Sequence, residues 1–423
     1  MKRYDSYKDS GVKWLGEIPS HWEVKRLRAA LSERKERFNS AESLMILSLI
    51  KDKGIIPYDE KGEVGNKSKD DHTQYKVARK GDLVINSMNV IIGSLGITPY
   101  DGYISPAYYA FKPNNNIFLS YYNYILSLRK VQQSIRCFSK GIMEIRLKIS
   151  AYDFLSMPFP FPTIKEQEAI ANYLDSATSK IDEVIAQQQK MIDLLNERKQ
   201  IIINNAVTKG LDPNVKMKPS GIDWIGDIPE HWEVSRFKSC SFVKANLVHP
   251  QNYLSYQQIS PECIEKNSGR LIGNKTVADA GVISDNHYFK KGQILYSKIR
   301  PALNKAIIAP FDGLCSADMY PIETINHPNF MLYVILSHYF SGQVQLVVND
   351  RVKMPKINKE ELGEIVVTYP PKIVEQGMIS SYIERELDKI QSVILKYNKQ
   401  ISLLQERKQI IINDVVTGKV KVV

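Results

Sequence analysis

The chain has few cysteines, and their arrangement excludes two classes of protein. Only four occur among 423 residues, with no Cys-x-x-Cys pair and no histidine cluster at zinc spacing. A secreted fold held together by disulfide bonds needs more cysteines than this, and a structural zinc site needs cysteines or histidines at close, regular spacing. We therefore expect reduced structural thiols at Cys137, Cys240, Cys263 and Cys315.

Long hydrophobic runs are also absent. The longest apolar run, Phe330 to Phe340, is too short to cross a bilayer. The first residues, MKRYDSYKDSGVKW, are too polar for a signal peptide. These features predict a cytoplasmic protein with no membrane partner.

Catalytic motifs are missing as well. The sequence contains no GxGxxG after a strand, no GxxxxGK[ST], no HExxH and no GxSxG. Tyr369–Lys372 (YPPK) has the two prolines of a DNA amino-methyltransferase loop without its flanking residues. Glu197-x-Lys199 and Glu406-x-Lys408 resemble a nuclease motif, but they fall within helical patterns where carboxylates do not converge on a metal. We expect no catalytic residue, no metal site and no cofactor.

Positive charge is present in excess, with a net charge of +11 and a pI near 9.1. Two helical segments, Glu166 to Ala206 and Glu375 to Val415, together carry a net charge of −3. The rest of the chain therefore carries +14. A basic excess confined to the globular parts is typical of proteins that bind a polyanion.

The chain contains an internal repeat. Leu194 to Thr208 (LLNERKQIIINNAVT) and Leu403 to Thr417 (LLQERKQIIINDVVT) are identical at 12 of 15 positions, 209 residues apart. Upstream of each copy, apolar residues recur at alternating steps of four and three. This spacing predicts two long helices that bury each other. A 41-residue helix is roughly 60 Å long at ~1.5 Å per residue.

We predict the contact seam of these helices from the spacing alone. Polar residues within it are expected to fix the register, as they do in coiled coils. If the second helix returns the chain past the first, the pair is antiparallel with one globular part at each end. The predicted seam residues are Ile170, Leu174, Ala177, Ile181, Val184, Gln188, Met191, Leu195, Arg198 and Ile202, and then Ile379, Ile383, Glu386, Ile390, Val393, Tyr397, Gln400, Leu404, Arg407 and Ile411.

A tryptophan motif also occurs twice. Gly11–Arg28 (GVKWLGEIPSHWEVKRLR) and Gly221–Lys238 (GIDWIGDIPEHWEVSRFK) match at 10 of 18 positions and hold all four tryptophans. We interpret each copy as a contact that packs the start of a globular part onto its own helix. Binding of a partner protein through an exposed tryptophan is the alternative.

Between these repeats the sequence is typical of strands and turns. Lys80–Asn89 (KGDLVINSMN) aligns with Lys291–Arg300 (KGQILYSKIR), so a Lys-Gly turn and a strand are kept while the residues after the strand differ. We call these differing ends tip 1 (Asn86–Asn89) and tip 2 (Ser297–Arg300). A shared frame with exchanged polar ends is expected of two modules that read different ligands.

Two helical segments follow, Ile117 to Ser139 and Asn329 to Val348, and each leads into a basic stretch. We call these stretches loop 1 (Lys140–Lys148) and loop 2 (Arg351–Lys356). A solvated surface explains any one basic run, but runs at equivalent places, beside Gly, Asn and Ser, favour phosphate contact and base reading. The candidate DNA-binding residues are Asn86, Ser87, Asn89, Lys140, Arg146, Lys148, Ser297, Lys298, Arg300, Lys305, Arg351, Lys353 and Lys356.

The repeated phrases together resemble the specificity subunits of type I restriction-modification systems. The phrases are WLGEIP-HWEV, KGDL-I, PFP-I-EQ and ERKQ-II, and they cover essentially the whole chain. The resemblance implies an α/β (α+β) fold with two recognition domains that each read half of a split site in double-stranded DNA. It also implies two antiparallel helices that set the gap and dock two adenine-methyltransferase subunits and, through them, two restriction-translocase subunits. Helix positions that we associate with docking are Glu166, Gln167, Arg198, Glu375, Gln376 and Arg407.

The expected organisation is a recognition domain at 1–162, a helix at 163–210, a second recognition domain at 211–371 and a second helix at 372–423. Two halves gripping one face of DNA would lie about one helical turn apart, ~34–36 Å. Three alternatives stay open: a coiled-coil scaffold whose end domains bind protein, the recognition half of a split methyltransferase-nuclease, and the same subunit in a methylation-only system or as a recombination-switched allele.

Overall fold

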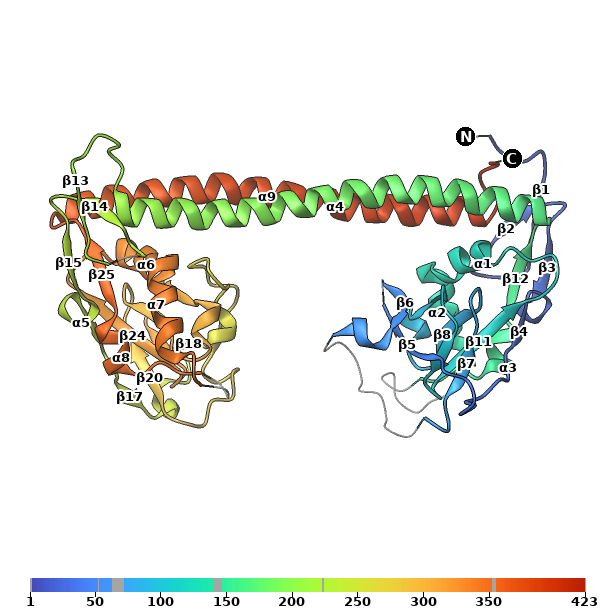
Figure 1. Ribbon diagram of the computed structural model, residues 1–423, viewed down its shortest axis with the longest axis horizontal. Coiled ribbons are helices and arrows are strands. Elements are labelled where there is room, and N and C mark those ends of the chain that lie inside the picture. The colour runs from blue at the N-terminus through green and yellow to red at the C-terminus, as the bar shows by residue number, and fades with distance from the viewer. Residues whose placement is uncertain are drawn as a thin grey trace. The chain divides into compact units, whose positions relative to one another are not determined.

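A computed structural model describes residues 2–51, 53–62, 72–139, 147–222, 224–351 and 355–422. The chain divides into two compact units. Unit 1 comprises Met1–Gln188 and Lys399–Val423, and unit 2 comprises Gln189–Asn398. Each unit therefore holds one globular part together with half of each long helix (Figure 1).

Unit 1 is built on two four-stranded sheets, with strand orders β6-β5-β10-β7 and β4-β11-β8-β9, and two small two-stranded sheets, β1-β2 and β12-β3. Its strands are β1 (Tyr7–Asp9), β2 (Glu17–Pro19), β3 (Glu23–Arg26), β4 (Leu31–Glu33), β5 (Met45–Ile50), β6 (Gly54–Pro57), β7 (Lys76–Ala78), β8 (Leu83–Asn86), β9 (Leu95–Ile97), β10 (Gly102–Ile104), β11 (Tyr108–Pro113) and β12 (Pro158–Phe161). Its helices are η1 (Leu27–Ala29), η2 (Tyr58–Lys61), η3 (Val90–Ile92), α1 (Leu119–Leu126), α2 (Arg129–Phe138) and α3 (Ala151–Ser156).

Unit 2 repeats this plan with strand orders β16-β24-β21-β22 and β17-β20-β23-β18-β19, beside the pairs β13-β14 and β15-β25. Its strands are β13 (Met217–Pro219), β14 (Asp227–Pro229), β15 (Glu233–Arg236), β16 (Ser241–Val243), β17 (Leu247–Val248), β18 (Gln257–Ile259), β19 (Lys275–Thr276), β20 (Asn286–Phe289), β21 (Ile294–Ser297), β22 (Ala306–Ile308), β23 (Gly313–Cys315), β24 (Met319–Thr324) and β25 (Val366–Tyr369). Its helices are α5 (Phe237–Cys240), η5 (Pro250–Tyr253), η6 (Pro261–Cys263), η7 (Pro301–Leu303), α6 (Pro328–Leu336), α7 (His338–Val348) and α8 (Lys359–Glu364).

The mixed α/β prediction with a pseudo-two-fold repeat is confirmed. Strands β8 and β21 are equivalent, and each is buried along its whole length because it lies between two neighbours and under helices. Glycines mark the same place in both units: a Cβ on Gly102 would lie 2.7 Å from the Met45 oxygen, and one on Gly313 would lie 2.4 Å from the Gln257 oxygen. Close backbone approach explains why both copies need glycine there.

The two predicted helical segments after the sheets are each broken in two. In unit 1, α1 ends at Leu126 and α2 begins at Arg129. In unit 2, α6 and α7 meet at a bend of 57°. Ser337 explains this break, because it leaves helical geometry and its side chain accepts a hydrogen bond from the Phe340 N–H. The sequence pattern did not separate a bent pair from one helix.

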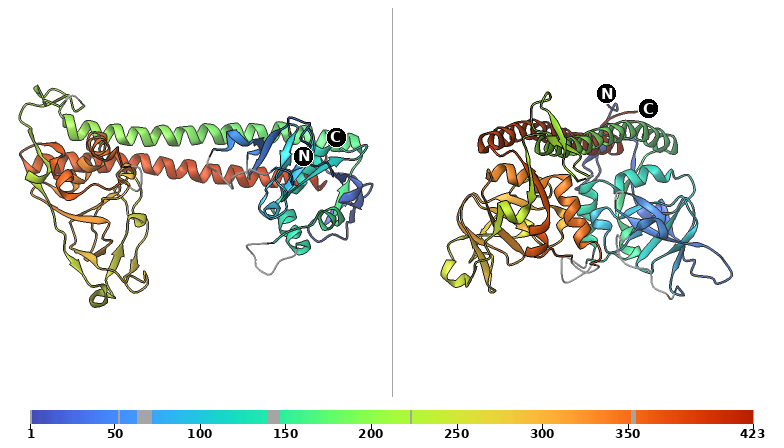
Figure 2. Two further views of the ribbon diagram at one scale, coloured as in Figure 1. Left: turned by 60° about the horizontal axis from the view of Figure 1, so that its bottom comes forward. Right: turned by 60° about the vertical axis from the view of Figure 1, so that its left-hand side comes forward.

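The long helices are α4 (Ile164–Lys209) and α9 (Ile373–Val416). They lie side by side within each unit (Figure 2). In unit 1, Lys408 pairs with Asp182 at 2.6 Å and Gln188 donates to Gln400 at 3.2 Å, so rising numbers on one helix meet falling numbers on the other. In unit 2, Lys199 donates to Gln391 at 2.6 Å in the same sense. The predicted antiparallel pairing is confirmed.

Half of the predicted seam is shifted by one residue. Leu174, Ile181, Leu195 and their equivalents do face the partner helix, but Val184, Met191 and Val393 are 39 to 42% exposed. The residues that take the other seam positions are Thr178, Ile185, Ile192 and Lys199 on α4, and Leu387, Ile394, Ile401 and Lys408 on α9. Seam residues recur at alternating steps of four and three along the helix. Where two adjacent residues are both apolar, as Val184 and Ile185 are, the sequence does not show which of them takes the seam position. The burial of Leu387, Ile394 and Ile401 on α9 shows which order of steps the helices use. Arg198, Glu386, Gln400 and Arg407 therefore lie outside the seam.

The tryptophan motif fastens each globular part to the start of a long helix. In unit 1, Trp22 is fully buried and its indole N–H donates to Glu166 Oε1 at 3.1 Å, while His21 Nε2 lies 2.8 Å from the same oxygen. In unit 2, the indole of Trp232 donates to Glu375 at 3.0 Å, and His231 lies 3.0 Å from that carboxylate. The repeated His-Trp and Glu therefore form one structural unit.

The next residue of each helix completes the attachment. Gln167 accepts from the Phe118 N–H at 2.9 Å and donates to the Pro162 carbonyl at 3.0 Å. Gln376 accepts from the His327 N–H and donates to the Pro370 carbonyl, at 2.6 and 2.8 Å. Each glutamine satisfies backbone groups at a helix start and a strand exit, which would otherwise be buried without partners.

The first tryptophan of each motif differs between the units. Trp14 packs on Phe159, with ring centroids 5.5 Å apart, and Lys130 lies 5.8 Å from its ring. Trp224 is 58% exposed. The packing interpretation therefore holds for Trp22, Trp232 and Trp14, and Trp224 is the one indole of the four that faces solvent.

The Glu166 contact predicts a response to acid. Burial alone would raise its pKa, but hydrogen bonds from His21, Trp22 and Thr163 outweigh burial and hold the pKa below its usual value of 4.5. A carboxylate with a lowered folded-state pKa stabilises above its unfolded pKa and loses that contribution as pH falls through the folded value. We expect the unfolding free energy to fall below about pH 5 more steeply in the natural protein than in Glu166→Gln. Urea titrations from pH 7 to pH 3 measure this, and parallel curves would contradict it.

Across the described ranges, no single helix is long and apolar enough to cross a membrane. The bent helix pair α6–α7 has the length and composition of a membrane span, and these are the only two criteria that it meets. Its apolar residues, including Phe330, Met331 and Phe340, belong to the core of unit 2.

Candidate nucleic-acid interface

Tip 2 and loop 2 come together in unit 2. The Ile357 N–H donates to the Lys298 carbonyl at 3.0 Å, and the Arg300 N–H donates to the Pro355 carbonyl at 2.9 Å. Ile299 and Lys356 form an isolated bridge. Two basic segments more than fifty residues apart in the sequence therefore present one surface.

Arg300 has a special position within this surface. It is exposed and lies in the left-handed region with φ +45°, three residues after the end of β21 and directly before Pro301. A non-glycine residue in this region costs about 1 kcal/mol or more, and it persists only where the surroundings hold it. Here the hydrogen bond from its backbone N–H to the Pro355 carbonyl holds this conformation.

The other candidate DNA-binding residues of unit 2 differ in how far their side chains are exposed. Lys298 is half-buried with its ammonium 5.0 Å from the Tyr320 ring, and Lys356 is exposed beside Asp318. Arg351 binds the Lys356 carbonyl and Glu361. Ser297 is buried, and the Lys305 ammonium donates to the Pro261 carbonyl at 2.7 Å, so neither side chain belongs to the exposed surface. Lys353 lies outside the described residues.

Sequence reasoning missed Asp318. Its carbonyl accepts from the Lys298 N–H and its carboxylate accepts from Lys356, each at 3.0 Å. The residue precedes β24 and carries no sequence signal, because its proximity to tip 2 arises only from the pairing of β24 with β21. An acidic side chain among basic ones can accept from a cytosine amino group.

Tip 1 repeats the backbone arrangement in unit 1. The Ile149 N–H donates to the Ser87 carbonyl at 3.1 Å, in the place of the bond between Ile357 and Lys298. Asn86 and Ser87 are buried, whereas Asn89 is exposed and Met88 is 44% exposed. The exposed end of tip 1 is thus an amide and a thioether, in contrast to the cations of tip 2.

Loop 1 is only partly described. Lys140 and Arg146 lie outside the described residues, and Lys148 is exposed next to the bonded Ile149. Two basic residues from elsewhere approach it: Arg37 and Lys76 form an isolated bridge, and burial together with repulsion from Arg37 and Lys148 lowers the Lys76 pKa. Arg37 ends the mixed-charge run Glu33–Arg37 and Lys76 is an isolated lysine, so neither stands in a purely basic run of the kind that marked loop 1.

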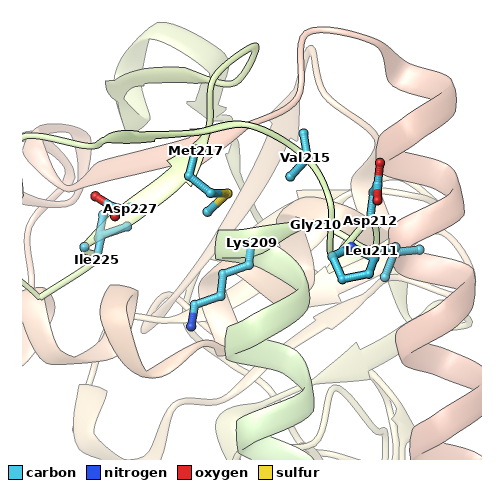
Figure 3. A pocket seen from close by; sticks show the side chains of 10 residues that line it. Lys209, Gly210, Leu211, Asp212, Val215, Met217, Ile225 and Asp227 are labelled. Carbon is cyan, nitrogen blue, oxygen red and sulfur yellow. The ribbon is translucent and has the colours of Figure 1, made fainter.

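A metal site and an acid-base pair would each need side chains that converge on one place. Among the described residues, no group of three or more His, Cys, Asp and Glu side chains could hold a metal ion. A cavity of about 580 Å³ lies at the end of α4, but the carboxylates of Asp212 and Asp227 stand on opposite sides of it and Lys209 points away from both (Figure 3). These groups do not converge as an acid-base pair would.

The helix positions considered for partner docking fall into two sets. Glu166, Gln167, Glu375 and Gln376 bind residues of their own unit, as described above. Arg198 and Arg407 are exposed. Each lies between two exposed apolar residues of the repeated phrase: Leu194 (46%) and Ile201 (58%) in unit 2, and Leu403 (54%) and Ile410 (53%) in unit 1. Spacings of four and seven place each trio on one face of its helix.

The chain is similar to one protein family and to several of its members. The family model described as "Type I restriction modification DNA specificity domain" matches residues 19–193. The EcoDI specificity subunit of the Escherichia coli type I restriction enzyme is 30% identical over 248 residues, which is 55% of each chain. The match thus spans about half the length of that relative.

Two further likenesses extend over nearly all of the chain. A putative type I restriction enzyme MjaX specificity subunit from Methanocaldococcus jannaschii is 25% identical over 98% of both chains. A solved chain from work on the complex assembly and conformational transition of the type I R-M system has a TM-score of 0.66 at 13% identity. That alignment covers 94% of this chain and 98% of the other, and it concerns the fold.

Proposed function

Because the chain belongs to the specificity subunits of type I restriction-modification systems, we propose that each of its units reads one half of a split, asymmetric DNA site. The observation that carries this proposal is the pairing of one fold with two different tips. Tip 1 ends in Asn89 and Met88, and tip 2 ends in Lys298 and Arg300. Equivalent scaffolds with unlike side chains at one place favour two unlike half-sites.

The exposed groups match the chemistry of base edges. Arginine and lysine pair with guanine in the major groove, asparagine pairs with adenine, and apolar groups contact the thymine methyl. Neighbouring cations such as Lys148 and Lys356 would bind phosphates and fix the position of each unit on the duplex. The recognition domains are residues 1–162 and 211–371 in this proposal.

The long helices in this proposal set the gap between the half-sites. Their register is supported by polar contacts between the two helices, namely Gln188 with Gln400 and the pairs made by Lys199 and Lys408. The same helices would carry two methyltransferase subunits, and through them two restriction-translocase subunits. The methyltransferase would extrude the target adenine and supply the chemistry, so this chain has only to position the duplex, in the cytoplasm where that DNA lies.

The two apolar trios are the docking surfaces in this proposal. Their sequences are identical, Leu-x-x-x-Arg-x-x-Ile, and their exposure is nearly equal. A helix face that exposes leucine and isoleucine on an otherwise polar surface is typical of a protein interface. Two equivalent faces related by a pseudo-two-fold axis should bind two copies of one partner.

The docking proposal predicts a change in stoichiometry. Leu194→Asp with Ile201→Asp should lose one methyltransferase copy, because two apolar contacts of roughly 1.5–3 kcal/mol each are replaced by charges. We expect that copy to bind about 100-fold more weakly or worse. Sedimentation of the mixed subunits measures it. Asn196→Asp, a new charge at another exposed site of α4, is the control, and retention of two copies by the double variant would contradict the proposal.

A DNA-binding experiment tests the function itself. The assembled complex should shift duplexes that carry the host methylation motif, with an affinity that falls steeply as salt rises, because phosphate contacts release counterions. A scaffold protein would associate independently of salt and would not shift DNA. A split methyltransferase would bind the methyl donor on the isolated chain. Either result would replace the proposal.

A further inference from the structure

An acidic groove in unit 1 is not explained by DNA reading or by the apolar trios. It lies between the end of α1 and α4, and it has a volume of about 450 Å³. Its lining residues are Tyr124, Asp175, Thr178, Ser179, Asp182, Glu183 and Ala186. Asp182 is paired with Lys408. Within the part of the chain that the structure describes, the Asp175 carboxylate accepts only from the hydroxyl of Tyr124, at 2.6 Å, and the Glu183 carboxylate accepts only from that of Ser179, at 3.3 Å.

Unit 2 contains the equivalent place, and there an arginine occupies it. The repeat offset of 209 matches Tyr124 with Tyr333, Asp175 with Glu384 and Ser179 with Asp388. Arg270 forms an ion pair with Asp388 at 3.0 Å. Glu384, Asp388 and Arg270 all act electrostatically on the buried Tyr333, whose pKa burial and the two acids raise to about 12. A guanidinium therefore sits among an aromatic hydroxyl and two carboxylates.

The segment that delivers Arg270 is specific to unit 2. It is the hairpin between β18 and β19, residues 260–274, closed by a bridge between Ile264 and Leu271. Gly269 packs so tightly on Leu332 and Leu336 that a Cβ would lie 3.2 to 3.3 Å from them, and Gln200 of α4 donates to the Asn267 carbonyl. The hairpin thus joins α6, α4 and α9.

The corresponding connection in unit 1 cannot do this. Strands β5 and β6 are joined by residues 51–53 alone, a connection too short to reach the helices. Unit 1 keeps the tyrosine and has three acids in the groove, and the basic residues between its matching strands, Lys51 and Lys53, belong to that short connection instead of a hairpin like the one that carries Arg270. The groove has the form of a receptor whose ligand comes from another chain.

We propose that the groove of Tyr124, Asp175 and Glu183 binds an arginine or lysine side chain of the methyltransferase subunit. This inference rests on the proposed function for the identity of the partner. Charge complementarity fits a cation, and the occupied groove of unit 2 identifies the guanidinium as the group that fits. Lys408, which contacts the groove through Asp182, lies in the helix phrase between Leu403 and Ile410, so the groove borders a proposed docking face.

One consequence is that the two partner copies meet unequal sites. The copy at unit 1 gains a charge-assisted contact, whereas at unit 2 the chain itself fills the place with Arg270. Titration of the full chain with methyltransferase should resolve two binding events that differ in affinity and in salt dependence.

The test removes the two charges that are not paired with a cation. Asp175→Asn with Glu183→Gln in the full chain should weaken the tighter event about tenfold and reduce its salt dependence, while the other event stays unchanged. Glu168→Gln with Asp193→Asn, which removes two exposed α4 charges outside the groove, is the matched control. Melting temperatures of all three proteins check that folding is unaffected.

A second measurement identifies the chain segment that binds in the groove. A photo-crosslinker on Ser179→Cys should capture a segment of the methyltransferase that contains an arginine or lysine. Capture of a segment of this chain, or equal affinities for the natural and neutralised proteins, would overturn the inference. If the natural protein binds two methyltransferase copies and shifts DNA in those experiments, the proposed function survives. If it binds no methyltransferase, both fail.

Discussion

Alanine in place of Lys298 and Arg300 is expected to remove discrimination at one half of the DNA site and to leave the other half intact. Both residues belong to tip 2, which lies wholly within unit 2. Each base contact that is lost should cost ~1–3 kcal/mol of discrimination, and each phosphate contact should reduce the salt slope by about 1. The two substitutions together should therefore lower affinity for the natural site at least about 30-fold.

The chain offers a matched control for this experiment. Lys290 and Lys291 lie just before β21, at the opposite end of the strand that bears tip 2. Their replacement by alanine removes the same charge from the same unit without touching the tip. A binding selection over randomised half-sites measures both variants. Equal loss at both half-sites, or equal effects of the two variants, would contradict the assignment of tip 2.

Trp232→Ala is expected to destabilise unit 2 by ~3–5 kcal/mol, the usual cost of truncating a buried aromatic side chain. The indole is 1% exposed, packs edge-on against Phe330 at 6.2 Å and donates to Glu375. Its loss leaves a cavity beside Gly210 and an acceptor without its donor. Because this residue joins the globular part to α9, the loss should also loosen the attachment of the domain.

Trp224→Ala is the matched control, since it removes the same side chain from the same motif where 58% of it is exposed. We expect its unfolding free energy to change by less than about 0.5 kcal/mol. Chemical denaturation followed by circular dichroism compares the two. A similar loss in both variants would mean that the motif stabilises in some other way.

The features that the sequence predicted well are those repeated within it. Matching segments 209 residues apart predicted two equivalent halves. Apolar residues recurring every 3.5 residues predicted two paired helices. The seam was half wrong because adjacent apolar residues, Val184 with Ile185 and Met191 with Ile192, satisfy either phase, and only the packed structure separates them.

The candidate site was predictable where it depended on one segment and not where it depended on pairing between segments. Lys298 and Arg300 follow a recognisable strand, whereas Asp318 reaches them through the pairing of β24 with β21. Arg37 and Lys76 approach Lys148 in the same indirect way. The burial of polar residues was also not predictable, because Asn86, Ser87 and Ser297 resemble exposed polar residues in the sequence yet are buried at the ends of β8 and β21.

The central claim is that two unlike reading units on one chain define a split DNA site. Sequencing of methylated adenines in the host, with and without this gene, tests it most directly. The account predicts that one motif disappears with the gene, and that this motif has two different halves separated by a fixed gap. Substitutions in tip 2 should then alter one half alone. Loss of no motif, or of a palindromic motif with identical halves, would contradict the claim.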